Sequence, residues 1–573
     1  MSEIRHETVS MLTRDGIRLD ADVYRPDTRE ELPILLMRQP YGRAIASTVV
    51  YAHPRWYAAA GYIVVIQDVR GRGTSGGEFK LFATEIADGI DTIDWVSQLR
   101  GSTGDIGMYG FSYQGMTQLY AASGKSSALK AIAPAMVSYD LYSDWAYENG
   151  AFCLQANLGW AIQLAAETAR LRGDKTAYQK LYAASRNLPL NEPIQVLPDI
   201  MQEFAADSFY YDWLSNPQPG EYWSKLSPKY LLQDVDLPML HIGGWFDPYL
   251  RGTLNLYRAM SQKSQHPQHL IVGPWAHLPW GRNLGAVDYG TQAQNPIDEI
   301  QIRWFDYFLK GKDTGIRSEA PISLFEMGSN QWRYLEEFPD SATTYYLASD
   351  GLASMREDSG MLWQYEDDLI AENSNDLSTT SEDLESYFAT DITGEFPNTK
   401  DIIVHDPWRS VPALGGHASF PSGSFERYNL DCRSDILTYT SYPLETDLHI
   451  VGTVTVELYC EADKPSFDLC AVLSEVYPNG KVFNFTQGYI KINSSNNPVT
   501  IPLQATCIKI PVGNCLRLSL SGACFPAYPV NSGTGKALLE THLIDNQIIT
   551  ISIMSGADFP SSLEFKIQSN KNS

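Results

Sequence analysis

One short segment of the sequence has the residues for nucleophilic chemistry. In Gly110-Phe-Ser112-Tyr113-Gln-Gly115, a serine lies between two glycines, directly after the apolar run Ile106–Tyr109. A serine hydroxyl becomes a good nucleophile when a histidine takes its proton and a carboxylate orients that histidine. Such a serine is commonly presented on a tight turn from strand to helix, with glycines where side chains would collide. The usual spacing is G-x-S-x-G, and this turn is one residue longer. Ser112 is therefore the candidate nucleophile.

Two further groups follow in the order that this chemistry requires. Asp247 comes shortly after the apolar run Pro238–Ile242, and His277 shortly after His269–Val272. Both runs are typical of buried strands, and open α/β sheets build their sites at the carboxyl ends of strands. We therefore expect Asp247 to orient His277, and His277 to act as general base toward Ser112.

Two other motifs suggest different chemistry. Gly71-Arg-Gly73-Thr-Ser-Gly76 matches the dinucleotide-binding pattern G-x-G-x-x-G, but helical spacing begins only near Ile86, so no helix opens within it. Leu414-Gly-Gly-His417 offers a second histidine, but it lies in a β-rich region with no acid after a strand. We favour a structural turn for His417 and no nucleotide cofactor.

The elements that must position these residues divide the chain into three regions. Buried strands alternate with amphipathic helices in residues 1–140 and again in 233–320, which predicts an α/β domain with a largely parallel sheet. Residues 141–232 are rich in Ala, Leu and Gln, which predicts a helical cap with helices over Phe152–Arg172 and Lys175–Ser185. Residues 321–573 alternate β-branched and polar residues, which predicts an antiparallel β-sandwich. The acidic segment 356–385 is typical of an exposed loop.

Composition excludes several classes of function. The net charge of -25 argues against binding to nucleic acid or to an anionic membrane surface. No apolar run approaches the roughly 18 residues of a membrane span, and the N-terminus lacks the pattern of a secretory signal, so we expect a cytoplasmic location. The seven cysteines form no C-x-x-C pair, and no metal site or cofactor is predicted. The sequence leaves open a homo-oligomer.

A larger set of motifs resembles one known family over almost the whole chain, the cocaine-esterase-like (CocE/NonD) hydrolases, which are related to X-Pro dipeptidyl-peptidases. Beside the Ser112 turn, the shared motifs are Gln67-Asp-Val-Arg70-Gly-Arg72-Gly73-Thr-Ser75-Gly, Gly244-Trp245-Phe-Asp247, Gly273-Pro-Trp275-Ala-His277, Trp304-Phe-Asp306-Tyr-Phe-Leu309-Lys-Gly311 and Asp406-Pro407 with Val411-Pro-Ala-Leu-Gly415-Gly416. The longer nucleophile turn is this family's own form.

The resemblance implies an α/β-hydrolase domain with a helical cap and an all-β C-terminal jelly roll. It assigns Ser112, His277 and Asp247 as nucleophile, general base and acid, and orienting carboxylate. It also implies an oxyanion hole made by the backbone N–H of Tyr113 and the hydroxyl of Tyr41, which matches the family's tyrosine in Gln39-Pro-Tyr41-Gly42. A phenol aimed at a developing alkoxide contributes a few kcal/mol, on the order of 3.

The substrate is less well specified. Aromatic residues near the catalytic loops could line an apolar acyl pocket, namely Trp145, Trp160, Trp245, Tyr249 and Trp275. Amino-ester hydrolases of this family hold a substrate ammonium with acidic residues after the catalytic aspartate. Here Pro248-Tyr-Leu-Arg251 follows Asp247, which puts that specificity in doubt.

We predict a serine hydrolase that cleaves a small-molecule ester or amide through an acyl-enzyme. Two alternatives remain open: a peptidase that releases X-Pro dipeptides, and a non-catalytic β-sandwich protein that binds carbohydrate. The first would turn over X-Pro aryl amides in preference to simple esters. The second would bind glycans and leave Ser112 unlabelled by a fluorophosphonate.

Overall fold

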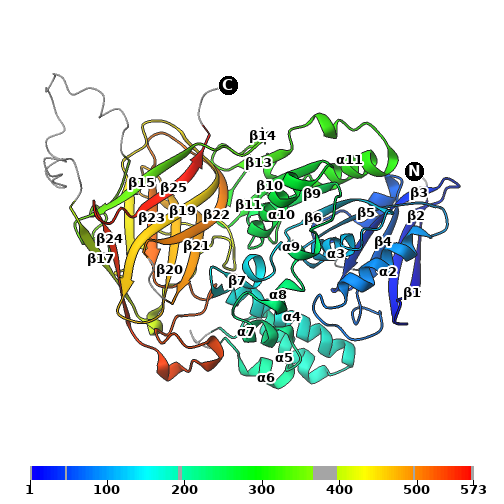
Figure 1. Ribbon diagram of the computed structural model, residues 1–573, viewed down its shortest axis with the longest axis horizontal. Helices are drawn as coiled ribbons and strands as arrows, with labels where there is room; N and C mark the ends of the chain where they lie inside the picture. Colours follow the sequence, from blue (N-terminus) through cyan, green and yellow to red (C-terminus); the bar gives the residue numbers. More distant parts are fainter. Residues whose placement is uncertain (1–2, 45–47, 191–195, 365–396, 494–496, 569–573) are drawn as a thin grey trace.

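Two large sheets lie next to each other in the computed structural model, with a group of helices along one side of the pair (Figure 1). The structure describes residues 3–44, 48–190, 196–364, 397–493 and 497–568. The acidic segment predicted at 356–385 lies outside the described residues from residue 365 onward.

The first sheet is mixed and has the strand order β1-β2-β4-β3-β5-β6-β9-β10-β13-β14. Neighbours from β4 to β13 are parallel, and antiparallel pairs stand at the two edges. The strands are β1 (Ile4–Leu12), β2 (Arg18–Pro26), β3 (Leu32–Gln39), β4 (Ile63–Asp68), β5 (Ser102–Phe111), β6 (Leu129–Ala135), β9 (Met239–Phe246), β10 (Gln268–Ala276), β13 (Ile322–Glu326) and β14 (Gln331–Leu335).

The boundary predicted at residue 320 is corrected by this sheet. Strands β13 and β14 follow residue 320, yet β13 pairs with β10 and extends the mixed sheet. The alternating pattern of a strand records that one side is buried, but it does not record which sheet edge the strand joins. The alternating pattern therefore begins at residue 321, although the next two strands, β13 and β14, still belong to the mixed sheet.

Helices cover both faces of the mixed sheet because successive side chains of its buried strands point to opposite sides. Ile34 and Leu36 of β3 belong to a core cluster that also holds residues of α2 (Glu85–Ser97), α3 (Tyr113–Ala122) and α10 (Leu250–Lys263). Leu35 and Met37 pack on the other face with α1 (Pro54–Ala59) and α11 (Ile297–Lys310). This three-layer arrangement confirms the predicted α/β organisation.

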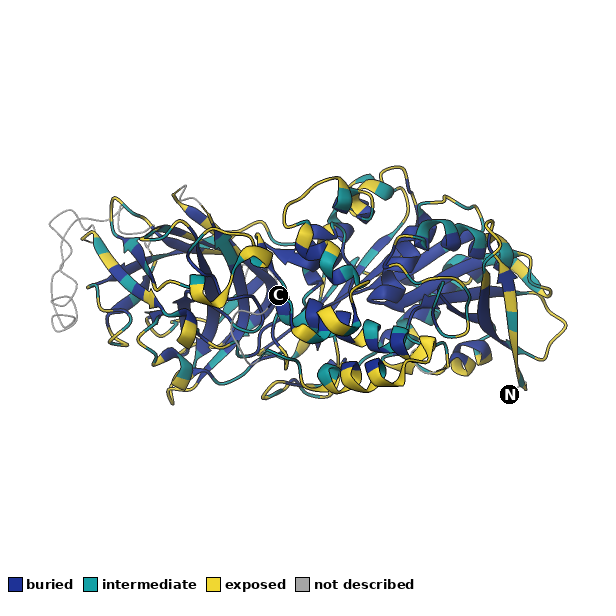
Figure 2. Cartoon of the chain, turned by 90° about the horizontal axis from the view of Figure 1, so that it is seen from below, coloured by how far each residue is buried: buried dark blue, intermediate teal, exposed yellow. Residues whose placement is uncertain are grey.

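A helical insertion, called the cap below, runs from η2 to α9 between β6 and β9. It contains η2 (Tyr142–Ala146), the hairpin β7 (Tyr147–Glu148) and β8 (Ala151–Phe152), α4 (Leu154–Arg172), α5 (Lys175–Arg186), α6 (Asp199–Phe204), α7 (Phe209–Ser215), α8 (Glu221–Ser224) and α9 (Pro228–Leu231). Gly173 ends α4 in the left-handed region at φ 76°, and the Asp174 side chain then caps α5 by accepting from the Ala177 N–H. The helices expected over Phe152–Arg172 and Lys175–Ser185 are confirmed, and their outer faces are exposed (Figure 2).

The β-domain, from β15 to β25, forms a separate all-β unit, and its hydrophobic core continues into residues of β9, α10, β10 and β13. Its strands are β15 (Ala342–Ser349), β16 (Gly360–Trp363), β17 (Thr399–His405), β18 (Ile436–Ser441), β19 (Leu448–Ala462), β20 (Phe467–Val476), β21 (Val482–Ile492), β22 (Val499–Ile510), β23 (Cys515–Ser521), β24 (Ile549–Ser555) and β25 (Ser562–Ile567). All but one of their pairings are antiparallel, the exception being β16 with β18. No helix in the described part of the chain is long and apolar enough to cross a membrane.

Candidate active site

The turn between β5 and α3 presents Ser112 in a strained conformation. Ser112 has φ 60° and ψ -125°, a backbone region that residues other than glycine rarely adopt. Its two flanking glycines are required by close packing. A Cβ on Gly110 would lie 2.5 Å from the Cβ of Gln114, and one on Gly115 would lie 2.4 Å from Cγ1 of Val137. The glycine spacing therefore lets α3 start tightly against β6 with the serine at its N-terminus.

The three residues predicted to cooperate lie in one hydrogen-bonded line. Ser112 Oγ is 2.9 Å from Nε2 of His277, and Nδ1 of His277 is 2.8 Å from Oδ1 of Asp247. Each residue directly follows a parallel strand: β5, β10 and β9 respectively. The strand ends thus bring together side chains that lie far apart in the sequence, at positions 112, 247 and 277.

Burial differs along this line in a way that suits proton transfer. Asp247 is fully buried, Ser112 is 7% exposed, and the His277 side chain is 28% exposed. Burial raises the pKa of the Asp247 carboxyl, and the hydrogen bond from His277 opposes that rise. A carboxylate in this position fixes the imidazole tautomer with Nε2 directed at the serine.

The hydroxyl oxygen of Tyr41 accepts one hydrogen bond from the cap. Trp160 Nε1, on α4, donates to the Tyr41 oxygen at 3.0 Å. Because the phenol accepts this hydrogen bond, its own hydrogen stays available for a different acceptor. Burial raises the pKa of Tyr41 to about 12, so the group remains a neutral donor at physiological pH.

The side chain of Tyr113 anchors the nucleophile turn to the core of the mixed-sheet domain. Its hydroxyl donates to Oε1 of Glu85 at 2.8 Å, and Oε2 of Glu85 accepts from Arg38 at 2.8 Å, all within the core. The backbone N–H of Tyr113 is the first of α3, where helix N–H groups lack intrahelical partners. Glu85 and Arg38 were not found by sequence reasoning, because neither lies in a motif with recognisable chemistry.

Three of the five predicted pocket residues form one aromatic cluster beside the histidine. The Tyr249 ring lies edge-on to His277, with centroids 4.9 Å apart, and it stacks on Trp145 at 4.0 Å. Trp145 in turn contacts Trp160 at 5.3 Å. The cluster therefore joins the histidine to the tryptophan that holds Tyr41.

Trp245 and Trp275 are held outside this cluster. Trp245 Nε1 donates to the carbonyl of Phe325 on β13 at 2.7 Å. Trp275 Nε1 donates to the carbonyl of Ala293 at 2.9 Å, and its ring stacks on Trp280. Sequence proximity to the catalytic loops did not distinguish these two side chains from the three that form the aromatic cluster beside His277.

A buried charged group lies next to the acid loop. Oε2 of Glu148, on β7, is 2.9 Å from Nη1 of Arg251 and 3.0 Å from Nε2 of His417, and it accepts from the Tyr528 hydroxyl at 2.5 Å. Burial alone would raise the pKa of Glu148, but Arg251 and His417 hold it below its ordinary value. His417 is thus buried and hydrogen-bonded to Glu148, which agrees with the structural role predicted for it.

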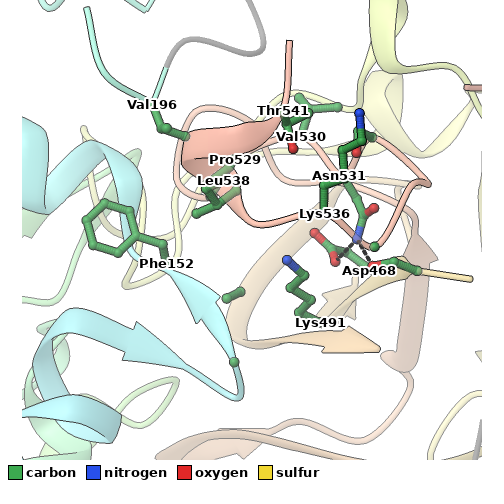
Figure 3. Close-up of a pocket in the computed structure, with 15 residues that line it drawn as sticks. Phe152, Val196, Asp468, Lys491, Pro529, Val530, Asn531, Lys536, Leu538 and Thr541 are labelled. Carbon is green, nitrogen blue, oxygen red and sulfur yellow. Dashed lines mark hydrogen bonds between the residues drawn. The ribbon is translucent and has the colours of Figure 1, made fainter. Parts of the chain in front are cut away.

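A separate cleft opens between the β7–β8 hairpin and the β-domain (Figure 3). Asp468 lies in its wall and accepts from Asn531 Nδ2 at 2.6 Å and from the Tyr489 hydroxyl at 2.7 Å. Burial raises the pKa of Asp468 to about 6. Lys491 extends into the same cleft (Figure 3).

Comparisons with known proteins agree with this architecture. Residues 15–279 match the X-Pro dipeptidyl-peptidase (S15 family), and residues 314–564 match the X-Pro dipeptidyl-peptidase C-terminal non-catalytic domain. A cocaine esterase of Rhodococcus sp. is 29% identical, with 97% of each chain covered.

Two solved structures share the fold over 99% of this chain and 97% of theirs. They are an aminopeptidase from a marine sediment Thaumarchaeota archaeon, with a TM-score of 0.77 at 21% identity, and an alpha-amino acid ester hydrolase, with a TM-score of 0.75 at 19% identity.

The fold and these matches identify an enzyme of the serine hydrolase class. The chain belongs to the cocaine-esterase-like (CocE/NonD) hydrolase family.

Proposed function

We propose that this protein hydrolyses a small-molecule carboxylic ester or amide, with esters preferred, through an acyl-enzyme on Ser112. The observation that carries the proposal is the line of hydrogen bonds from Ser112 to His277 to Asp247, with distances of 2.9 and 2.8 Å. The match to a cocaine esterase over nearly the whole chain supports an ester as the substrate class.

The reaction has two steps. In the first, His277 Nε2 takes the Ser112 proton as Oγ attacks the carbonyl carbon, and it then delivers that proton to the leaving group. The Tyr41 hydroxyl and the Tyr113 N–H receive the negative charge that develops on the carbonyl oxygen. In the second, His277 takes a proton from water as the water oxygen attacks the acyl carbon. His277 then returns this proton to Ser112 Oγ as the bond between Oγ and the acyl carbon breaks, which releases the acid.

The aromatic cluster supports an apolar acyl or alcohol group. We propose that Trp145, Trp160 and Tyr249 line the substrate pocket, since their rings connect His277 with Tyr41. Trp245 and Trp275 are proposed as supports of the acid and histidine loops, since their indole N–H groups are bonded to main-chain carbonyls.

The peptidase alternative is the weaker one because a substrate ammonium lacks an unpaired carboxylate after Asp247. Arg251 occupies this region and neutralises Glu148. Support for the alternative comes from the family's own name, X-Pro dipeptidyl-peptidase. We accordingly expect 4-nitrophenyl butyrate to be cleaved with a kcat/KM at least about 100-fold higher than that of Ala-Pro-4-nitroanilide, a gap of about 2.7 kcal/mol.

Ser112→Ala tests the central assignment. Turnover of 4-nitrophenyl butyrate should fall by a factor on the order of 10⁴ or more, and labelling by a fluorophosphonate should be lost. Ser123→Ala, at the other end of α3, is the matched control and should keep both. Undiminished turnover by the Ser112 variant would refute the nucleophile, and glycan binding without labelling of the wild type would favour the non-catalytic alternative.

The cap, the jelly-roll topology, the cellular location and the oligomeric state are also proposals. We infer that residues 141–232 act as the cap of an α/β-hydrolase domain. We also infer that the β-domain is a jelly roll, supported by its almost wholly antiparallel strand pairings. The high negative charge supports a small-molecule partner in the cytoplasm over nucleic acid or membrane. A homo-oligomer remains open to measurement by light scattering.

A further inference from the structure

One side chain of the β-domain reaches across to the loop that bears Asp247. Gln504 lies on β22, the strand that runs along the side of the β-domain facing β9, α10 and β13 (Figure 1). Its Nε2 donates to the carbonyl of Trp245 at 2.9 Å and to the carbonyl of Asp247 at 3.0 Å. The Gln504 side chain is 2% exposed, so both hydrogen bonds are shielded from water.

A β-bulge explains why Gln504 points out of its own domain. The pairing of β22 with β19 changes register between Leu503 and Thr506, so that two residues of β22 oppose one of β19. Up to Leu503 the strand alternates between buried and exposed residues, and from Gln504 onward that alternation stops. Bulges re-aim side chains and are frequent near active sites. This one directs an amide toward the mixed sheet.

The two hydrogen bonds fix the main chain at the acid. The acceptor carbonyls stand on either side of Phe246, where β9 ends, so one amide group clamps the three-residue segment that carries the Asp247 side chain. The same Asp247 carbonyl also accepts from the Leu250 N–H at 3.2 Å. On its other side Asp247 meets His277 at 2.8 Å, so a displacement of this segment would lengthen that contact directly.

We propose that Gln504 is a positioning residue for Asp247, so that the β-domain, whose family is described as non-catalytic, takes part in aligning the acid, base and nucleophile. This inference rests on the proposed function. It differs from a purely adhesive role at the domain interface, which would change stability without acting through Asp247.

Gln504→Met removes both donors and keeps the length of the side chain. The kcat for 4-nitrophenyl butyrate should fall by about 10- to 100-fold, because small displacements of catalytic groups have effects of that size, whereas KM should stay within about twofold. Gln504→Glu keeps the shape but turns an acceptor toward two carbonyl oxygens, and its kcat should fall at least as far.

Asn514→Leu is the matched control. Asn514 is another buried amide of the β-domain, and its Nδ2 donates to Glu475 within the same domain at 2.6 Å. This variant should lose thermal stability comparably to Gln504→Met while its kcat stays within about twofold of the wild type.

A double-mutant cycle with Asp247→Ala separates positioning from adhesion. When the carboxylate is absent, its position no longer matters, so adding Gln504→Met should change the rate of fluorophosphonate labelling by less than about twofold. An adhesive role predicts equal effects of Gln504→Met in both backgrounds, and that result would overturn the proposal. So would full kcat in both Gln504 variants, or failure of both to fold.

The outcome is separable from that of the proposed function. If Ser112→Ala keeps its activity, the nucleophile assignment fails whatever Gln504 does. If Ser112 is confirmed and the Gln504 variants keep their kcat, only the inference about the β-domain fails.

Discussion

At the scale of single residues, the site combines one strained serine with a tyrosine hydroxyl that is already hydrogen-bonded. The Ser112 backbone holds φ 60°, and the Tyr41 hydroxyl accepts from Trp160. In the oxyanion role that we propose for it, this indole orients the Tyr41 phenol before a substrate carbonyl arrives. Preorganised donors of this kind contribute more than flexible ones, because the cost of orienting them was met during folding.

Tyr41→Phe tests the phenol directly. We expect kcat for 4-nitrophenyl butyrate to fall by about 10²- to 10³-fold, the usual effect of losing one oxyanion donor, with KM little changed. Trp160→Phe should cost less, because the phenol keeps its hydrogen and loses only the indole that orients it. Tyr62→Phe, whose hydroxyl donates to Asp306 at 2.6 Å on α11, serves as the control. Full activity in Tyr41→Phe would remove Tyr41 from the mechanism.

At the scale of elements, the position of the nucleophile depends on how closely α3 approaches β6. Gly115 allows this approach, since a Cβ there would lie 2.8 Å from the Ala135 carbonyl oxygen as well as 2.4 Å from Val137. Backbone atoms cannot yield as a flexible side chain can, so any larger residue must push the helix away from the strand.

Gly115→Ala should therefore move the start of α3 together with Ser112. We expect a loss of stability of about 1–3 kcal/mol, the usual cost of overpacking, and a kcat lower by about tenfold or more. The control is Gly159→Ala on α4, where the new Cβ meets only Leu188 at an ordinary 3.5 Å. That change should keep the activity and raise the thermal midpoint slightly, because alanine favours a helix. Equal behaviour of the two variants in denaturation and kinetics would contradict the packing argument.

At the scale of the whole molecule, buried polar groups join the cap, the mixed sheet and the β-domain. Glu148 meets Arg251 and His417 from the other two units, and Gln504 reaches the acid loop. A further buried carboxyl, that of Asp468 in the wall of the cleft beside the β7–β8 hairpin, has its pKa raised by burial to about 6, within the range that denaturation experiments reach.

The pH dependence of stability follows from Asp468. Its pKa in the folded state exceeds the ordinary 3.8, so the folded chain holds this proton more tightly than the unfolded chain. The resulting stabilisation is complete below pH 4 and is lost as the pH rises through 6, a change on the order of 2–3 kcal/mol. Asp468→Asn lacks this dependence while its amide can still bond Tyr489 and Asn531.

Urea denaturation of both proteins between pH 4 and pH 7 provides the measurement. The unfolding midpoint of Asp468→Asn should rise relative to the wild type as the pH increases, with most of the change between pH 4 and 6. Parallel curves for the two proteins across this range would show that the Asp468 carboxyl does not titrate as the structure indicates.

The sequence alone predicted that Ser112, Asp247 and His277 lie together, because their signals are local. Each follows a buried strand at short range, and parallel strands necessarily bring their carboxyl ends to one edge. Hydrophobic periodicity also predicted the helices of the cap and the antiparallel strands of the β-domain, since the period indicates which type of element forms.

Only the tertiary structure decided which distant surfaces meet. Trp145 and Tyr249 stack beside His277 while Trp245 and Trp275 bond to main-chain carbonyls, although all four looked alike in the sequence. The pairing of β13 with β10 and the hydrogen bond from Gln504 to the Asp247 carbonyl were likewise decided by the tertiary structure. A residue's own pattern records that it is buried, but its partner is set by the packing of segments hundreds of residues apart.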